Sequence, residues 1–286
     1  MPYRRDSEPR LRSTQVTTEH PLQAWRLELE PYYAPQADEV VAFEAANALR
    51  LPLLLKGPTG CGKTRFVEHM AWRLGKPLIT VACHDDLTAS DLVGRWLLDA
   101  QGTRWHDGPL TQAVRHGALC YLDEIVEARA DTTVVLHPLI DARRILPLTA
   151  CNELLHAHPD FQLVVSYNPG YQSMHKTLKP STRQRFVGME FSHPAAEHEA
   201  TVVAHEGRVD APLAHQLVAV AERTRRLKEH GLAEGASTRM LINAAALTRQ
   251  GLSARTACLH AITCPLSDDP DLSAALAAAV DASFAR

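Results

Sequence analysis

The sequence predicts an α/β domain with a parallel sheet, followed by a small all-helical domain. Between about residues 51 and 191, short apolar runs alternate with amphipathic stretches, as in parallel strands joined by helices. After His193 the pattern indicates helices only, at about 195–206, 212–230, 238–250 and 271–284. We therefore expect a polar, disordered arm over residues 1–30, the α/β domain over 31–192 and a helical lid over 193–286.

Composition excludes several classes of protein. A formal net charge of −3 and a pI near 6.6 argue against a dedicated nucleic-acid binder, which needs a basic face. No apolar run approaches the roughly 20 residues that cross a bilayer, and no apolar segment follows the early arginines as in a secretory signal. The six cysteines form no CxxC pair, which favours reduced thiols over disulfides or a zinc site. We expect a cytoplasmic protein without a membrane span.

Five apolar runs provide the expected strands of the sheet: LPLLL, LITVA, ALCYL, FQLVVSY and VGMEF. Between the second and third runs, residues 96–107 (WLLDAQGTRWHD) indicate two short strands around a turn at Asp99–Gly102, an inserted hairpin. Pro109 is favoured at the start of a helix and Gly117 just after its end. These two residues predict a helix between the hairpin and the third strand.

A phosphate-binding loop follows the first strand. Residues 57–64 read GPTGCGKT, a full match to GxxxxGK[ST] between a strand and a helix. In such a P-loop, backbone N–H groups and the helix N-terminus surround the phosphates, Lys63 reaches the β- and γ-phosphates, and Thr64 offers a hydroxyl to Mg²⁺. The sequence thus predicts a site for ATP and Mg²⁺ whose nucleotide contacts come from Gly57, Pro58, Thr59, Gly60, Cys61, Gly62, Lys63, Thr64 and Arg65.

Polar residues end two further strands. Asp123 at the end of ALCYLDE is expected to hold Mg²⁺ together with Thr64, and Glu124 to orient and deprotonate the attacking water. Asn168 ends FQLVVSYN, and its amide is expected to hold that water between Glu124 and the γ-phosphate. Taken alone, an acidic pair after a strand is as often a helix-capping turn, and Asn-Pro-Gly is an ordinary turn.

Three arginines complete the expected catalytic set. Arg183 and Arg185 in STRQRF lie far along the chain from the P-loop, so either fits a guanidinium that enters the site of a neighbouring subunit. Arg239 follows Ser237, a candidate N-cap, and would contact the γ-phosphate from the first turn of a lid helix. For all three residues, an ordinary solvated arginine is the alternative reading.

The combination of motifs resembles the CbbQ/NirQ/NorQ group of MoxR-type AAA+ ATPases. The resemblance covers roughly residues 31–206. In the lid, mainly the STR that contains Arg239 is recognisable. The segments that carry the resemblance are GPTGCGKTRFVEHMAWRLGKPLITVAC, DLTASDLVGRWLLD, GTRWHDGPL, YLDEIVEARADTTVVLHPLID and FQLVVSYNPGYQS. It implies a P-loop NTPase AAA+ module with Walker A residues Lys63 and Thr64 and Walker B residues Asp123 and Glu124. Asn168 would be sensor 1, Arg239 sensor 2, and Arg183 or Arg185 the finger.

The same resemblance implies partners. It suggests a hexameric ring that works with a von Willebrand factor A domain adaptor on a client enzyme. Rubisco, freed of inhibitory sugar phosphates, is slightly favoured as the client over nitric oxide reductase, which would receive its metal centre. Two alternatives stay open: a P-loop kinase or phosphotransferase, and a nucleotide-dependent transcriptional regulator, for which the sequence shows neither a basic face nor a helix-turn-helix.

Overall fold

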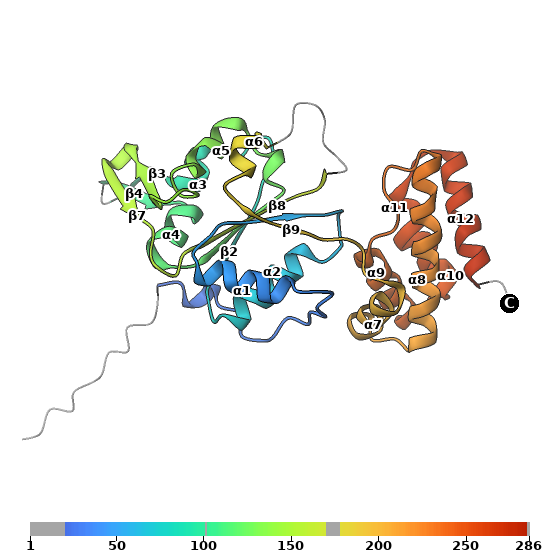
Figure 1. Ribbon diagram of the computed structural model, residues 1–286. Coiled ribbons are helices and arrows are strands. Elements are labelled where there is room, and N and C mark those ends of the chain that lie inside the picture. Colours follow the sequence, from blue (N-terminus) through green and yellow to red (C-terminus); the bar gives the residue numbers. More distant parts are fainter. Residues whose placement is uncertain (1–20, 101, 170–177, 285–286) are drawn as a thin grey trace, which may run out of the picture.

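A five-stranded parallel sheet forms the centre of the first domain in the computed structural model, which describes residues 21–100, 102–169 and 178–284 (Figure 1). The strand order is β2-β5-β8-β1-β9, and every neighbouring pair is parallel. The five predicted runs are these strands: β1 Leu53–Lys56, β2 Leu78–Ala82, β5 Leu119–Asp123, β8 Gln162–Tyr167 and β9 Val187–Glu190. The predicted α/β fold is therefore confirmed.

The strand order decides which chain segments meet. Strand β8 lies between β1 and β5, and all its residues are buried. Because parallel strands present their carboxyl ends at one edge, the loops after β1, β8 and β5 converge there. The P-loop, Asn168 and Asp123 follow or end these three strands, so one edge of the sheet collects them.

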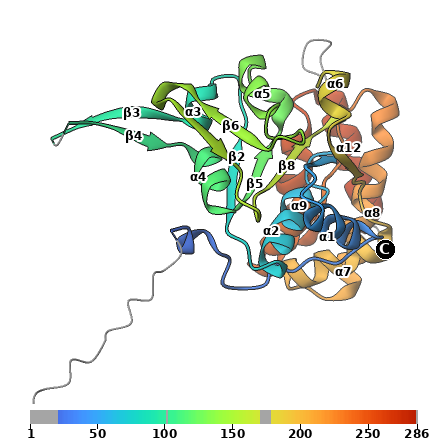
Figure 2. The ribbon, with the colours of Figure 1, turned by 60° about the vertical axis from the view of Figure 1, so that its left-hand side comes forward.

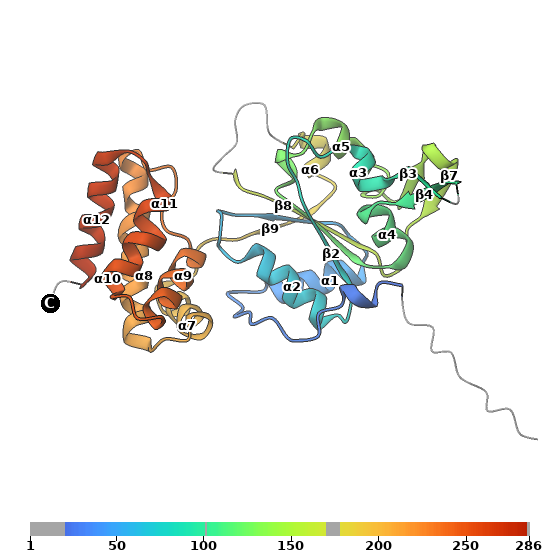
Figure 3. The same ribbon diagram turned by 180° about the vertical axis from the view of Figure 1, so that it is seen from behind.

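Helices cover both faces of the sheet, as Figures 1 and 3 show. On one face lie α1 Glu39–Ala48 and α2 Lys63–Arg73, whose Phe43, Phe66 and Met70 are fully buried against the sheet. The other face carries α3 Ala89–Val93, α4 Pro109–His116, α5 Ala130–Leu136 and α6 Pro180–Arg183. The predicted helix from Pro109 to Gly117 is confirmed as α4, and Gly117 ends it with φ 75°.

The inserted hairpin is present as β3 Gly94–Asp99 and β4 Gly102–Asp107, which are antiparallel and project from the domain (Figure 2). Trp96 lies opposite Trp105, and their rings meet edge-on with centroids 5.7 Å apart. A second hairpin, β6 Ile145–Leu148 and β7 Glu153–His156, was not expected from the sequence. Its first strand contains Pro147, which weakens any strand signal because proline cannot donate to a ladder.

Side chains join the two hairpins. Trp96 Nε1 donates to the carbonyl of Ala150 at 3.1 Å. From α4, Arg115 Nε donates to Asp107 Oδ2 at 2.8 Å, and its Nη1 donates to Glu153 Oε1 at 2.7 Å. Charge-assisted contacts of this kind fix direction as well as distance. The two hairpins are thus held to each other and to the helix that leads into β5.

The second domain is a helical lid (Figure 1, orange to red). The four expected helices are α7 Ala196–Gly207, α8 Ala211–Arg226, α9 Thr238–Arg249 and α12 Pro270–Phe284. The sequence pattern missed a further helical segment, made of α10 Ala254–Cys258, a π-helix over Leu259–Thr263 and α11 Cys264–Leu266. The wider π-helical turns and the shortness of the flanking helices break the 3.6-residue period that would have revealed them.

A buried ion pair lies at the end of the lid nearest to the segment 57–64. Glu199 is fully buried, and both of its carboxylate oxygens accept from Arg225 at 2.7 Å. Thr238, the first residue of α9, donates its hydroxyl to the same carboxylate at 2.6 Å. This network fixes the start of α9, from which Arg239 projects.

The expected arm over residues 1–30 differs from the structure in its last third. Residues 1–20 lie outside the described residues, but Leu22 is 3% exposed and belongs to the apolar core. Arg26 donates from Nη1 to the carbonyl of Gly75 at 2.6 Å, beside a short 3₁₀ helix at Gln23–Trp25. Residues 21–30 therefore pack on the α/β domain. None of the helices in the described part of the chain has the length and apolar character of a membrane span.

Candidate active site

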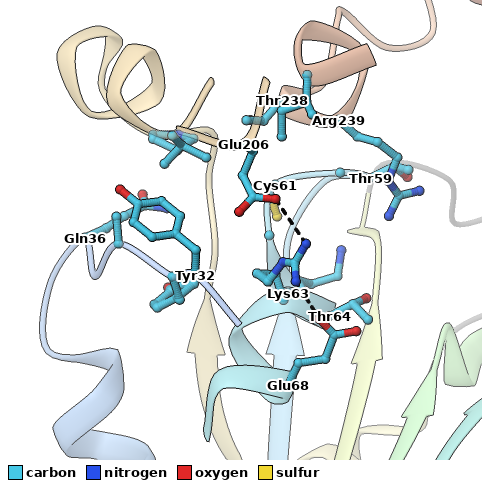
Figure 4. A pocket seen from close by; sticks show the side chains of 18 of the residues that line it. Tyr32, Gln36, Thr59, Cys61, Lys63, Thr64, Glu68, Glu206, Thr238 and Arg239 are labelled. Carbon is cyan, nitrogen blue, oxygen red and sulfur yellow. Dashed lines mark hydrogen bonds and ion pairs between the residues drawn. The ribbon is translucent and has the colours of Figure 1, made fainter. Parts of the chain in front are cut away.

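A cavity of about 490 Å³ lies between the P-loop and the lid. Figure 4 shows Cys61, Lys63 and Thr64 on the P-loop side, Thr238 and Arg239 from the lid, and Tyr32 and Gln36 from the segment before α1. The residues that line it are Tyr32, Tyr33, Ala34, Gln36, Thr59, Gly60, Cys61, Gly62, Lys63, Thr64, Arg65, Glu68, Asp123, Glu124, Pro194, His198, Val202, Glu206, Thr238, Arg239 and Ile242.

The P-loop geometry depends on its glycines. Gly60 and Gly62 have φ of 69° and 105°, a region that residues with a Cβ rarely adopt. A Cβ on Gly60 would lie 2.7 Å from the Ser237 hydroxyl, so the lid also approaches the loop too closely for a side chain. Ser237 occupies the predicted N-cap position of α9, but its side chain makes no capping hydrogen bond.

Lys63 lies at the base of the cavity with an exposure of only 6%. Its Nζ donates to the carbonyls of Gly57 at 2.7 Å and Pro58 at 2.9 Å. Gly57 and Pro58 do not line the cavity themselves, but they hold the ammonium beneath the N-terminus of α2. Together, the ammonium and the free N–H groups of this 11-residue helix make the base of the cavity electropositive.

Asp123 is surrounded by hydroxyl groups. Its Oδ1 accepts from Tyr121 at 2.7 Å and from Ser166 at 2.5 Å, while Thr64 Oγ1 lies 3.5 Å from Oδ2. A carboxylate from β5 and a hydroxyl from α2 are hard oxygen donors of the kind that Mg²⁺ takes beside nucleotide phosphates. The residues present at this position therefore fit the metal that the P-loop motif implies.

Glu124 adopts a left-handed backbone conformation with φ 56°, which is uncommon for a residue other than glycine. Its N–H donates to Ser166 Oγ at 3.1 Å, and its Oε2 accepts from the backbone N–H of Asn168 at 3.3 Å. Burial raises the pKa of this carboxyl, the charge of Asp123 adds to the rise, and Lys63 opposes it. A carboxylate that protonates more readily suits proton transfer from water.

Asn168 lies behind the cavity wall with an exposure of 3%. Its Nδ2 donates to Thr59 Oγ1 at 3.2 Å and to Glu234 Oε1 at 2.8 Å. The structure therefore brings Asn168 next to Glu124, as the strand order requires, but its amide is also bound to the lid. No motif in the sequence pointed to Glu234.

The predicted arginines fall into two groups. Arg239 lines the cavity, as does Arg65, which donates from Nη2 to Glu206 Oε2 of the lid at 3.3 Å. Arg183 and Arg185 are exposed and do not line the cavity of their own chain. They lie at the end of α6 and just before β9.

Comparison with known proteins decides the family. The AAA domain of the dynein-related subfamily matches residues 52–186, and the CbbQ/NirQ/NorQ C-terminal region matches residues 199–283. Protein CbbQ of Hydrogenophilus thermoluteolus is 63% identical over 256 residues, which cover 90% of this chain and 96% of that protein. Protein NorQ of Paracoccus denitrificans is 60% identical over 242 residues, which cover 85% and 90% of the two chains. The chain belongs to the CbbQ/NirQ/NorQ family of MoxR-type AAA+ ATPases.

Solved structures agree on the fold of this family member. A RuvB mutant of Thermotoga maritima superposes with a TM-score of 0.52 at 17% identity, covering 85% of this chain and 68% of that one. The chain is an AAA+ ATPase. Such P-loop enzymes use ATP as the nucleotide and Mg²⁺ as the metal ion.

One wall of the site was not foreseen and lies before the AAA domain match, which begins at residue 52. Tyr32 stacks on His205 of the lid with ring centroids 3.6 Å apart. Tyr33 donates its hydroxyl to Glu39 at 2.8 Å, and the same carboxylate accepts from the N–H groups of Gln36 and Ala37. The only available sequence signal was the acid at the start of α1, which binds the preceding turn.

Proposed function

We propose that the cavity between the P-loop and the lid is the site of ATP hydrolysis, with the residue roles that the motifs imply. The proposal is carried by one observation: Lys63, the adjacent pair Asp123 and Glu124, and Arg239 line the same cavity although they come from three separate segments. Thr64 and Asp123 are the residues that would hold Mg²⁺, which neutralises charge at the β- and γ-phosphates when bound.

In this mechanism, phosphate binding, water activation and the response of the lid are carried out by different residues. Lys63 and the N-terminus of α2 bind the phosphates, and Glu124 takes a proton from the attacking water. The water oxygen bonds to the γ-phosphorus while the bond from that phosphorus to the bridging oxygen breaks, so ADP leaves with the electron pair and phosphate is released. Asn168, bound to Glu124 through its backbone N–H, orients that water with its amide. Arg239 carries the state of the γ-phosphate to the lid.

We further propose that the protein works as a hexameric ring in which Arg183 or Arg185 completes a neighbour's site. Both side chains are exposed and lie outside the cavity of their own chain. A guanidinium that acts on a phosphate from there must therefore act on another subunit. Such a finger contributes about 10³ to 10⁵ in rate in P-loop enzymes.

Subunit mixing tests this arrangement. Substitution of the finger, in Arg183→Ala or Arg185→Ala, should lower kcat by about 10³-fold or more. Mixing that variant with Lys63→Ala protein should restore activity above the sum of the separate rates, because mixed rings place an intact arginine beside an intact P-loop. The matched control mixes Lys63→Ala with Glu124→Gln, where no rescue is expected. Failure of every mixing ratio to restore activity would contradict the shared site.

We also propose that the ring remodels a client enzyme in the cytoplasm together with a von Willebrand factor A domain adaptor. Rubisco is the client that we place first and nitric oxide reductase second. Support comes from the high identity to proteins named CbbQ and NorQ along most of the chain. The joined hairpins, with Leu98 at 82% exposure, offer a surface through which movement could reach a partner.

A pull-down tests the client. Glu124→Gln protein saturated with ATP should retain its adaptor and client, because hydrolysis no longer resets the complex. Material captured from the native cytosol is identified by mass spectrometry, with Lys63→Ala at the same ATP concentration as the matched control, because this variant should bind ATP more weakly. If a von Willebrand factor A protein is recovered together with Rubisco or with a nitric oxide reductase, that enzyme is identified as the client. If neither variant retains a protein partner, the remodelling role is wrong and a phosphotransferase becomes the better hypothesis.

A further inference from the structure

Glu234 of the lid reaches across the domain boundary to the amide of Asn168, with 2.8 Å between Oε1 and Nδ2. It lies in the segment between a 3₁₀ turn at Leu227–His230 and α9. No motif of the nucleotide site includes it. It is nevertheless the acidic group of the lid that bonds to the side chain expected to orient the attacking water.

The segment that carries Glu234 is fixed within the lid. Ala236 donates its N–H to Thr224 Oγ1 at 3.0 Å and accepts from Arg225 Nε at 2.9 Å. A Cβ on Gly235 would meet the Arg225 backbone at 2.5 Å, so the chain packs directly against α8. The position of Glu234 therefore follows the position of the lid as a rigid body.

Both N–H groups of the Asn168 amide have partners in this conformation. One is directed to Thr59 of the P-loop and the other to Glu234 of the lid. Glu234 also lies close enough to the P-loop for its charge to act on Cys61: burial raises the pKa of that thiol, Lys63 opposes the rise, and Glu234 adds a smaller increase. The carboxylate and the P-loop residue Thr59, which lines the cavity, thus accept from the same amide.

We propose that Glu234 is a positioning residue that holds Asn168 when no γ-phosphate is present and is displaced by the γ-phosphate of ATP. The proposal rests on the role of Asn168 proposed above. A carboxylate and a phosphate are both anionic acceptors, so they compete for the same amide donor and repel each other. ADP lacks the competing group and leaves the contact in place.

This competition gives the lid a way to distinguish ATP from ADP. Entry of ATP releases Asn168 to the γ-phosphate and the water, and it frees the lid from the edge of the sheet. Departure of phosphate after hydrolysis lets Glu234 rebind the amide. The hydrogen bond between Glu234 and Asn168 therefore weakens ATP binding and leaves ADP binding unchanged.

The test compares Glu234→Ala and Glu234→Gln with Glu229→Gln, a matched exposed acid in the preceding turn. Kd is measured for ADP and for the β,γ-imido analogue of ATP on the assembled protein, and kcat and KM for ATP. In Glu234→Ala, Kd for the analogue and KM for ATP should fall about tenfold, the scale of a lost charged hydrogen bond, while Kd for ADP stays constant. Glu234→Gln keeps an acceptor without the charge and should shift the same values less.

An unchanged Kd for the analogue, or an equal change for ADP and the analogue, would overturn the proposal in favour of a purely structural contact. The constant ADP affinity also verifies that the variant site is folded. Asn168→Ala separates this inference from the function on which it rests. If Asn168→Ala keeps full kcat, the proposed role of Asn168 fails, whatever the Glu234 variants show.

Discussion

Glu124→Gln is expected to lower kcat for ATP hydrolysis by about 10² to 10⁴-fold while ATP still binds with unchanged Kd. Glutamine has the same shape and can still accept from the N–H of Asn168, but it cannot take a proton from water. Phosphate release and equilibrium nucleotide binding measure the two quantities separately. Glu127→Gln, three residues further on, is the matched control and should keep full activity. A loss of ATP binding that parallels the loss of kcat would show that Glu124 serves the binding site instead.

The pH dependence of kcat gives a second measurement on the same residue. Burial and the charge of Asp123 raise the Glu124 pKa above the ordinary value of 4.5, against the opposing effect of Lys63. Glu124 must be deprotonated to act as a base, so kcat should fall as the pH drops through this raised pKa. The residual rate of Glu124→Gln should lack that acidic limb. If Glu124→Gln keeps the same fall of kcat at low pH, the fall is due to the protonation of a group other than Glu124.

Lys63→Ala is expected to raise Kd for ATP and ADP by about 30-fold or more, the effect of removing one partner of a buried charged contact. The substitution removes the ammonium from the base of the cavity and leaves the carbonyls of Gly57 and Pro58 without that donor. Binding is measured by titration with each nucleotide, with circular dichroism to verify the fold. Lys228→Ala, on the exposed lid surface, is the control and should bind normally.

The two substitutions together test the division of roles. Lys63→Ala should lose binding, whereas Glu124→Gln should keep binding and lose turnover. Equal loss of binding in both variants would contradict the assignment of one residue to the phosphates and the other to the water.

Local sequence patterns were sufficient to predict the sheet and the P-loop half of the site. The P-loop is a contiguous motif between a strand and a helix, so its position and the need for Gly60 and Gly62 could be read directly. Asp123 and Glu124 follow a buried strand, and the five apolar runs gave the sheet. These features depend on neighbours in sequence, which is why composition and spacing predict them.

The remaining half of the site depends on how distant segments pack. Tyr32, Glu206 and Glu234 come from the N-terminal segment and the lid, and no periodicity or spacing relates them to the P-loop. The sequence established that Asn168 ends a strand and that a helical lid follows. The tertiary structure decided that the lid approaches Gly60 and binds the Asn168 amide through Glu234, because the packing of one domain against the other fixes which side chains meet.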